Sequence, residues 1–508
     1  MRNKRIKLDL DKTMDETPSC ECDKKIHTDT DKGILQLFKL AASSQNHVTL
    51  LDISVKIEQL SAEYIYSCLK SSVMPDLLIQ TIKTAIVGEL PEREHCQYEE
   101  QDFVGTADKT DAVLKNFASI FHHLNSLELL ESAVMNCLNK VLPSLLLLLS
   151  ANMTPAAWNS SGVVDQSMML SQCMLKLYKC DTTGKLLTLN MDSQNHDFIS
   201  PSSSLFGKYL RLVKPCLDRD RWKRNPFVQA SFIHLLTSVK QSSISEHLTD
   251  ILPPSLNFID DFVVENKISG IKCLRHIIAN TSSEELRWYG RAEVVYEAVK
   301  HQLYTKNATL LQDAIPTVLA VVRVVERTPD NIHSGLLLDV NRYDEIFQML
   351  LHDAELENNI HIRRALTSHL WKFVDELGIG VVRHMKNVVH LVSNFLEIYD
   401  GPEETSRLNA LMMLKSLIKN AWPRVYSHCE EILKCLLKLL YDLAVDETTT
   451  SKEVKDNLHD ESVSCLVLLR YCCPRLVESY LNELNKPETA ECIRETVQLV
   501  MQADVPCC

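Results

Sequence analysis

Glycine is scarce in this chain: only 12 of its 508 residues are glycine, whereas soluble proteins contain about 7%. Glycine is costly inside helices and most useful in tight turns. Its scarcity therefore argues against a β-rich fold with many turns. The composition favours a chain that is helical throughout.

The chain also lacks an excess of basic residues. It has 54 Lys and Arg against 67 Asp and Glu, which gives a net charge of −13. A general nucleic-acid-binding protein needs a basic footprint that neutralises phosphates. We therefore expect no nucleic acid among its partners.

Long hydrophobic runs are missing as well. The longest aliphatic run, residues 145–149 within 141–150, is too short to span a bilayer. Residues 1–7 are basic, but residues 8–17 are mostly polar, so we expect no secretory signal. The 17 cysteines should then be reduced thiols in a cytoplasmic and nuclear protein without a membrane anchor.

Apolar residues recur at helical spacing along most of the chain. A chain of 508 residues is too long for one ordinary compact domain but suits stacked helical repeats, which bury their apolar faces against neighbours. The sequence predicts an all-α fold, a HEAT-like or armadillo-like α-solenoid. Its expected parts are a disordered N-terminal tail (1–32), an irregular N-terminal helical region (33–180), a flexible loop (181–204), HEAT-like helical repeats (205–484) and a C-terminal tail (485–508).

The most informative stretch is residues 399–425, which predicts two antiparallel helices over 403–420 and 424–445, about the length of one HEAT repeat. Asp400 can cap the first helix, and Glu403 completes the spacing of a capping box. Gly401 allows the chain to turn, and Pro402 presets the dihedral of a first helical turn.

The second half of that stretch carries Trp422, Pro423 and Arg424. Pro423 can end one helix and start the next. For Trp422 two roles are open: it fills the corner between the helices, which we favour, or it contacts a partner. We expect Arg424 to be an exposed partner contact.

A second polar cluster contains Asp260, Asp261, Glu265 and Lys267. Asp260 or Asp261 is expected to cap a helix over 261–280, because no convergent ligands for a metal accompany them. Glu265 and Lys267 either fix a turn or face a partner, and the sequence leaves both roles open. We expect no catalytic, cofactor or metal residues here.

Other chemical signals are incomplete. Cys20 and Cys22 with His27 form half a zinc site, and the second pair of ligands is missing. Cys507 and Cys508 resemble prenylated C-termini, but no Gly-rich phosphate loop accompanies them, so we interpret them as a frayed tail. His384 has no nucleophile or carboxylate at a useful spacing. The sequence therefore predicts a protein that is not an enzyme and has no cofactor.

Three blocks of sequence resemble the Tti-two family, the smallest subunit of the TTT (Triple T) cochaperone complex. The resemblance implies a non-catalytic scaffold that binds Tti-one directly and acts with Tel-two. Together with the Hsp90 chaperone system, the complex supports the folding, stability and assembly of phosphatidylinositol 3-kinase-related kinases, among them DNA-damage kinases and the target-of-rapamycin kinase. The blocks are Tyr-Asp-Gly-Pro-Glu-Glu at 399–404 with Trp-Pro-Arg-Val at 422–425, a group of motifs at 252–274, and Arg-Trp-Lys at 221–223 with Asn-Pro at 225–226.

Two alternatives remain at this point. The first is an importin-like transport adaptor or another helical-repeat interaction scaffold, for which a longer and more regular array is expected. The second is an enzyme on a helical scaffold, which would need convergent titratable groups.

Overall fold

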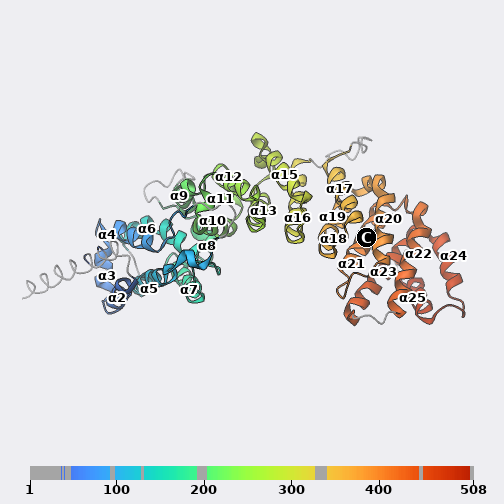
Figure 1. Cartoon of the computed structure of the whole chain (residues 1–508), viewed down its shortest axis with the longest axis horizontal. Helices are drawn as coiled ribbons and strands as arrows, with labels where there is room; N and C mark the ends of the chain where they lie inside the picture. Colours follow the sequence, from blue (N-terminus) through green and yellow to red (C-terminus); the bar gives the residue numbers. More distant parts are fainter. Residues whose placement is uncertain are drawn as a thin grey trace, which may run out of the picture. The chain divides into compact units, whose positions relative to one another are not determined.

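The computed structural model describes residues 47–91, 98–127, 131–191, 203–326, 340–445 and 450–503, together with positions 36 and 39. These residues form helices and turns (Figure 1). The described chain contains no strand, and its one β-bridge is an isolated antiparallel pair between Asn190 and Ser204. The prediction of an all-α chain is confirmed.

Backbone contacts divide the chain into two compact units, Met1–Ser243 and Ile244–Cys508. The division falls later than the predicted loop at 181–204, part of which forms a short helix. The predicted domain ranges remain a prediction, and each unit is best described by itself.

The first unit is organised around two long helices, α5 and α6. Helix α5 packs against α2 and α7, whereas α6 packs against α4, α9 and α10. The aliphatic run at 145–149 lies in α6 and is buried along its whole length. The helices are α2 His47–Glu58, α3 Ala62–Leu69, α4 Met74–Ala85, α5 Thr106–Asn125, α6 Ser132–Ser150, α7 Ser161–Leu177, α8 Thr183–Leu187, α9 Leu205–Val213 and α10 Pro226–Ser238, with 3₁₀ turns η1 Glu100–Phe103, η3 Lys214–Cys216 and η4 Trp222–Arg224.

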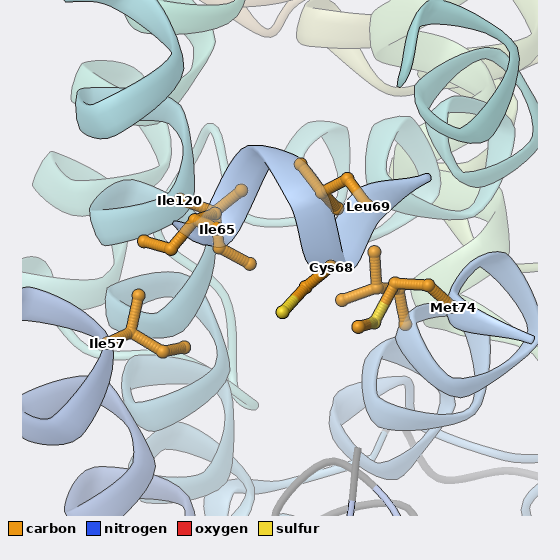
Figure 2. Close-up of a pocket in the computed structure, with 7 residues that line it drawn as sticks. Ile57, Ile65, Cys68, Leu69, Met74 and Ile120 are labelled. Atoms are coloured by element: carbon orange, nitrogen blue, oxygen red, sulfur yellow. The ribbon is translucent and has the colours of Figure 1, made fainter. Parts of the chain in front are cut away.

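A small cavity lies in the apolar core of the first unit (Figure 2). Its volume is about 10 Å³, which is no more than a single water molecule needs. It is a packing void rather than a ligand site. It is lined by Ile57, Ile65, Cys68, Leu69, Met74, Leu78 and Ile120.

The second unit is a stack of helical hairpins. Its described residues form five hairpins: α12 with α13, α15 with α16, α17 with the broken helix α18–α19, α20 with α21, and α22 with α23. The second helix of each hairpin packs against the second helix of the next, as α16 does against α13 and α18, and α21 against α19 and α23 (Figure 1). This repeated packing confirms the HEAT-like fold class.

The helices of the second unit have the following bounds. They are α12 Leu248–Ile259, α13 Val264–Ala279, α14 Ser283–Arg287, α15 Arg291–His301, α16 Ala308–Val325, α17 Arg342–Leu356, α18 Ile360–Thr367, α19 Leu370–Leu377, α20 Met385–Glu397, α21 Thr405–Ala421, α22 Cys429–Val445, α23 Lys452–Cys472, α24 Pro474–Leu484 and α25 Glu491–Gln502. The 3₁₀ turns are η5 Trp288–Gly290, η6 Gln302–Tyr304, η7 Gly378–His384 and η8 Val425–His428, and α11 Gln241–Glu246 spans the division between the units.

Helix α25 occupies part of the stretch that was expected to be a C-terminal tail. Ile493, Val497 and Val500 recur at helical spacing and are buried. The helix packs against α22, α23 and α24. This apolar stripe is the signal that the sequence interpretation missed.

Helices α6 and α16 are long and apolar enough, by length and composition alone, to cross a membrane. More than half of the apolar window of each is buried inside the structure, 61% for α6 and 56% for α16. Such burial is typical of core helices whose apolar surface is covered by neighbouring helices. Their composition is therefore explained by packing.

Gly270 lies where α13 crosses α12 at close range. A Cβ atom at this position would stand 2.5 Å from the backbone nitrogen of Ile259 and 2.9 Å from its Cα. We expect Gly270→Ala to lower the free energy of unfolding by about 1–3 kcal/mol through overpacking, although alanine favours a helix. Urea unfolding checks this. Gly162→Ala is the matched control, because Gly162 lies in an exposed turn of α7 where a Cβ would come no closer than 4.0 Å to Oγ of Ser160. Equal effects of both changes would contradict the close crossing.

His369 lies at the break between α18 and α19, where its Nδ1 is 2.7 Å from the Ser368 hydroxyl oxygen. Burial first, and then the charges of Lys372 and Arg275, lower the pKa of this imidazole from 6.5 to about 4. The unfolded chain therefore binds the proton more readily than the folded chain between these two values. The contribution of neutral His369 to stability is complete above pH 6.5 and is lost as the pH falls towards 4.

We expect His369→Gln to reduce the loss of stability between pH 7.5 and pH 5. Urea unfolding of both proteins at the two pH values measures the difference. The exposed His352 on α17 provides the control variant His352→Gln. If His369→Gln and the wild type lose the same free energy of unfolding on acidification, protonation of His369 does not oppose folding.

Candidate partner-binding site

The turn that enters α21 is built around one buried carboxylate, Asp400, which is only 3% exposed. Its Oδ2 accepts a hydrogen bond from the backbone amide of Ser406 at 2.7 Å. Ser406 belongs to the first turn of α21, so Asp400 does satisfy a free amide at the start of the helix. It acts from outside the N-cap position, because the helix begins at Thr405 rather than at 403.

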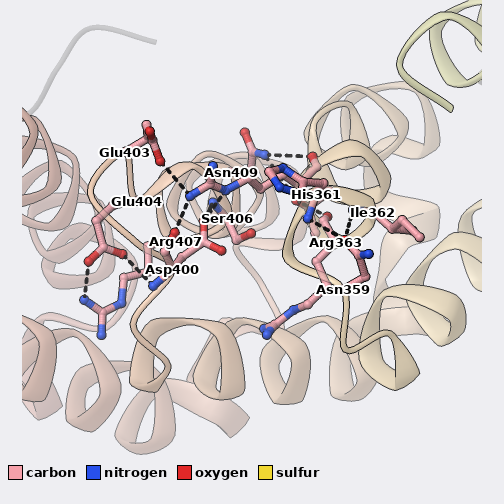
Figure 3. A network of polar contacts seen from close by, with 12 residues as sticks. Asn359, His361, Ile362, Arg363, Asp400, Glu403, Glu404, Ser406, Arg407 and Asn409 are labelled. Carbon is pink, nitrogen blue, oxygen red and sulfur yellow. Dashed lines mark hydrogen bonds and ion pairs between the residues drawn. The ribbon is translucent and has the colours of Figure 1, made fainter. Parts of the chain in front are cut away.

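Arg364 of α18 joins this turn to the preceding hairpin. Its Nε donates to Oδ2 of Asp400 at 3.0 Å, and its Nη2 donates to the Asp400 carbonyl and to Oε2 of Glu403, the latter at 3.0 Å. Figure 3 shows Asp400, Glu403 and Glu404 gathered at this turn. The guanidinium therefore holds the α20–α21 turn against α18.

The outer carboxylate of the turn, Glu403, is largely exposed. Its pKa lies below the usual range because its own backbone amide donates to the carboxyl and Arg364 adds a second hydrogen bond and a charge. Such an exposed pair contributes little to stability. Arg364 thus makes one buried ion pair and one exposed ion pair.

Glu404 is the true N-cap residue of α21 and has a left-handed backbone, with φ 49° and ψ 31°. This conformation costs a residue with a Cβ about 1–3 kcal/mol. The side chain is 1% exposed. Its Oε1 accepts from Nη1 of Arg407 at 3.2 Å, and its Oε2 accepts from the Asp400 amide at 3.3 Å. These charge-assisted contacts offset the strain.

The predicted capping box of Asp400 with Glu403 is wrong, because the side chain that reaches back to the Asp400 amide is Glu404. Gly401 has φ +80° and makes the turn as expected. Pro402 precedes the helix instead of lying in its first turn. Because Glu404 is the N-cap residue and α21 starts at Thr405, the roles predicted for Glu403 and Pro402 are not made by these residues.

At the other end of α21 the side chain of Trp422 is 62% exposed. The interpretation that it fills the corner between the helices is therefore wrong. Ala421, Val425 and Cys429 fill that corner, and each is fully buried. Pro423 is exposed in the turn, and α22 begins only at Cys429, after η8.

The three residues predicted to bind a partner lie in two hairpins, with Glu265 and Lys267 on α13 and Arg424 after α21. Arg424 is exposed in the turn between α21 and η8, as expected. Glu265 is exposed in the first turn of α13, and Lys267 is half-buried and donates from Nζ to Oε1 of Gln302 at 2.9 Å. Lys267 therefore ties α13 to η6. That these residues bind a partner remains a prediction.

Neither aspartate before α13 caps that helix. The N-cap residue is Val263, without a side-chain cap, and Asp260 is the C-cap residue of α12. Asp261 is 4% exposed, and its Oδ2 accepts from Nδ2 of Asn266 at 2.7 Å. The contact between Asp261 and Asn266 thus helps to fix the turn between α12 and α13.

His384 has a carboxylate partner that the sequence interpretation missed. Its Nε2 lies 2.7 Å from Oδ1 of Asp344, and Nη2 of Arg383 lies 3.0 Å from the other oxygen. Asp344 also closes a capping box with Asn341 at the start of α17, and the His384 ring packs edge-on against Phe347. The pair is buried and joins η7 to α17. Its contacts are those of a structural pair.

Within the described part of the chain, no three His, Cys, Asp or Glu side chains come together as metal ligands would. The candidate half-site at Cys20, Cys22 and His27 lies outside the described residues, as do Cys507 and Cys508. The sequence interpretation missed Arg364 and Arg407, whose side chains hold the turn. Nothing in their local spacing indicates that they contact Asp400 and Glu404. Asn359, whose Oδ1 accepts from the amides of His361 and Ile362 at the start of α18, could have been found as an N-cap residue.

The model of the Tti2 family matches residues 214–420, which include the whole turn between α20 and α21. Relatives named TELO2-interacting protein 2 are similar over longer segments. The human protein is 37% identical over 282 residues, 56% of this chain and 55% of its own length, and the mouse protein is 32% identical over 347 residues, 67% and 66%. The chain belongs to the Tti2 family. Its matches span between about half and two thirds of the length of these relatives.

Two of the three blocks that indicated this family lie wholly inside the matched range, and the third extends beyond it. Residues 422–425 lie just beyond the last matched residue, 420. In the block at 221–226, Trp222 is buried, and Arg221 pairs with Glu89 at 2.6 Å. The block therefore holds the segment before η1 against the start of α10 in this Tti2 family member.

Solved structures with a similar helical course include yeast importin-β, with 14% identity and a TM-score of 0.46 over 89% of this chain and 59% of that one. An engineered protein has 9% identity and a TM-score of 0.39 over 92% and 98%. At these values neither likeness bears on the function of this Tti2 family member.

Proposed function

We propose that this chain is a non-catalytic scaffold subunit of the TTT complex, which supports the folding, stability and assembly of phosphatidylinositol 3-kinase-related kinases with the Hsp90 chaperone system. Membership of the Tti2 family carries the proposal. The relatives are named for an interaction with TELO2, which supports Tel-two as a partner within the complex. Tti-one is proposed as the subunit that this chain binds directly. Hsp90 and the kinases are reached through the complex, in the cytoplasm and the nucleus, without nucleic acid or membrane.

The mechanism that suits the structure is the presentation of a surface. The α20–α21 turn is made from caps, a left-handed residue and ion pairs, and these groups fix backbone positions. Residues of this kind give a scaffold the stiffness that a preorganised interface needs. The function proposed for the chain is therefore to position partners along its hairpins.

Co-expression with tagged Tti-one and Tel-two, followed by size-exclusion chromatography, tests the assembly. Rapid depletion of this chain in cells tests the role, with the abundance of the target-of-rapamycin kinase and the DNA-damage kinases as the readout. We expect a stable complex and a fall in these kinases, while an unrelated protein kinase keeps its level. A chain that does not co-elute with Tti-one, or kinase levels that survive its depletion, would contradict the proposal.

A further inference from the structure

Three large aromatic side chains are exposed where the fourth and fifth hairpins of the second unit meet. Trp422 directly follows α21, Tyr426 lies in η8, and Tyr471 lies in the last turn of α23. Their exposed fractions are 62%, 67% and 66%. By contrast, Trp158 and Trp222 are buried in the first unit.

Tertiary packing brings the two segments that carry these residues together. Helix α23 packs against both α21 and η8. The buried thiols of Cys429, directly after η8, and Cys473, directly after α23, interact with each other, and burial raises the pKa of both. Tyr471 is two residues before Cys473 in sequence. Trp422 and Tyr471 lie at the C-terminal ends of the two packed helices α21 and α23, and Tyr426 lies in η8, which also packs against α23.

Three exposed cations accompany the aromatic residues. Lys419 lies in the last turn of α21, Arg424 lies two residues after Trp422, and Arg475 lies in the first turn of α24. None of the three has an ion-pair partner among the described residues. We call the three aromatic residues and three cations the aromatic–cation surface.

Three acidic side chains close to this surface in sequence contact other residues. Glu430 accepts from the Tyr480 hydroxyl at 3.3 Å, and Glu431 lies 3.6 Å from His428. Glu478 pairs with Arg470 at 3.2 Å. Glu478 is neutralised by Arg470, whereas Glu430 and Glu431 keep their charge, so the three cations exceed the neighbouring unpaired carboxylates by one on a chain whose net charge is −13.

We infer that the aromatic–cation surface docks an acidic segment of a partner protein, in which Asp or Glu side chains flank an apolar residue. Trp, Tyr and Arg are the residues that dominate the energy of interfaces. An arginine can bind a carboxylate through two parallel hydrogen bonds, and the aromatic faces supply apolar contact area. Charge complementarity selects the acidic occupant, because the same surface would repel a basic segment. The inference rests on the proposed function only in the test that uses Tti-one as the partner.

The chemistry of the occupant can be tested with a peptide probe. Fluorescence anisotropy would measure binding of a labelled peptide of Glu and Leu to the full chain, beside the same peptide with Lys in place of Glu. We expect the acidic peptide to bind, and Arg424→Glu or Trp422→Ala to weaken it at least about tenfold. The inference would be overturned if the wild type bound the acidic and the basic peptide equally well. It would also be overturned if the wild type and both variants bound the acidic peptide equally well.

Matched controls test whether the effect is specific to this surface or follows from changing any exposed arginine or tryptophan. Arg219→Glu reverses an exposed arginine of the first unit, and Trp288→Ala removes a tryptophan that is 61% exposed. Both controls should bind the acidic peptide as the wild type does. Circular dichroism and thermal unfolding should be unchanged in all four variants, because surface changes away from the core alter stability by no more than about 0.5 kcal/mol.

Binding of purified Tti-one, measured by biolayer interferometry at low and high salt, distinguishes the two proposals. We expect Arg424→Glu to weaken binding about tenfold or more and to reduce its salt dependence. If the wild type does not bind Tti-one while the acidic peptide still binds at this surface, the proposed function fails and the docking inference stands. If Tti-one binds the wild type and both variants equally, the docking inference fails and the proposed function stands.

A photo-crosslinking residue in place of Tyr426 identifies the occupant within the reconstituted complex. A crosslinked peptide rich in Asp and Glu supports the inference. A basic or uncharged peptide would overturn it, and so would a crosslink to a nucleic acid or to a second copy of this chain. Sedimentation of the wild type and of Trp422→Ala tests for a second copy of this chain at the surface. A wild-type dimer that dissociates in Trp422→Ala would identify the second copy as the occupant and overturn the inference.

Discussion

Leu411→Ala is expected to lower the free energy of unfolding by about 2–5 kcal/mol. Leu411 is fully buried on α21, which packs against α19, α20 and α23. The substitution removes buried apolar contacts of α21 and leaves a cavity that a stacked array cannot close by moving one neighbour alone. Urea unfolding monitored by circular dichroism measures the change.

Leu436→Ala on α22 should behave in the same way, because Leu436 is also fully buried. Met412, next to Leu411 but 37% exposed, gives a control on the same helix. Met412→Ala should change the free energy of unfolding by much less. An unfolding midpoint of Leu411→Ala equal to that of the wild type would show that this side chain does not lie in the core.

Arg364→Ala is also expected to have a large effect and to lower the free energy of unfolding by about 3–5 kcal/mol. The substitution leaves the carboxylate of Asp400 buried with no cation beside it and removes the link between α18 and the α20–α21 turn. Leaving one partner of a buried ion pair unpaired costs far more than breaking an exposed pair. Glu403→Gln, which disturbs only the exposed pair with Arg364, should cost at most about 1 kcal/mol.

A double-mutant cycle tests whether the buried pair acts as a unit. The double substitution Arg364→Ala with Asp400→Ala should cost less than the sum of the two single substitutions. Urea unfolding of all four proteins gives the coupling free energy. Additive effects would show that Arg364 stabilises the chain by packing and not through Asp400.

Much of the fold follows from local sequence. The spacing of Leu411, Leu414 and Ile418 predicts one buried face of a helix, and all three are fully buried in α21. Gly401 was predicted to turn the chain, and its positive φ does so. These features depend on residues within one or two helical turns of each other, so their physical cause is contained in the local sequence.

The candidate site was predicted less well. Asp400 was recognised as a capping residue, yet the position from which it caps α21 depends on Glu404, whose strained backbone persists because Arg407 and the Asp400 amide bind its carboxylate. Arg364 comes from a different hairpin, 36 residues earlier in sequence. No local pattern relates it to Asp400.

The sequence by itself determined that this chain is helical, which faces of most helices are apolar and that it resembles one family, because helix periodicity, capping and motif order are properties of neighbouring residues. Only the tertiary structure decided which charges are buried together and which aromatic residues stay exposed. Trp422 shows the reason. Its exposure depends on how α21, η8 and α23 stack, and three smaller side chains already fill the corner that its sequence position suggested. Stacking of distant helices, and not local spacing, therefore set the surface available to a partner.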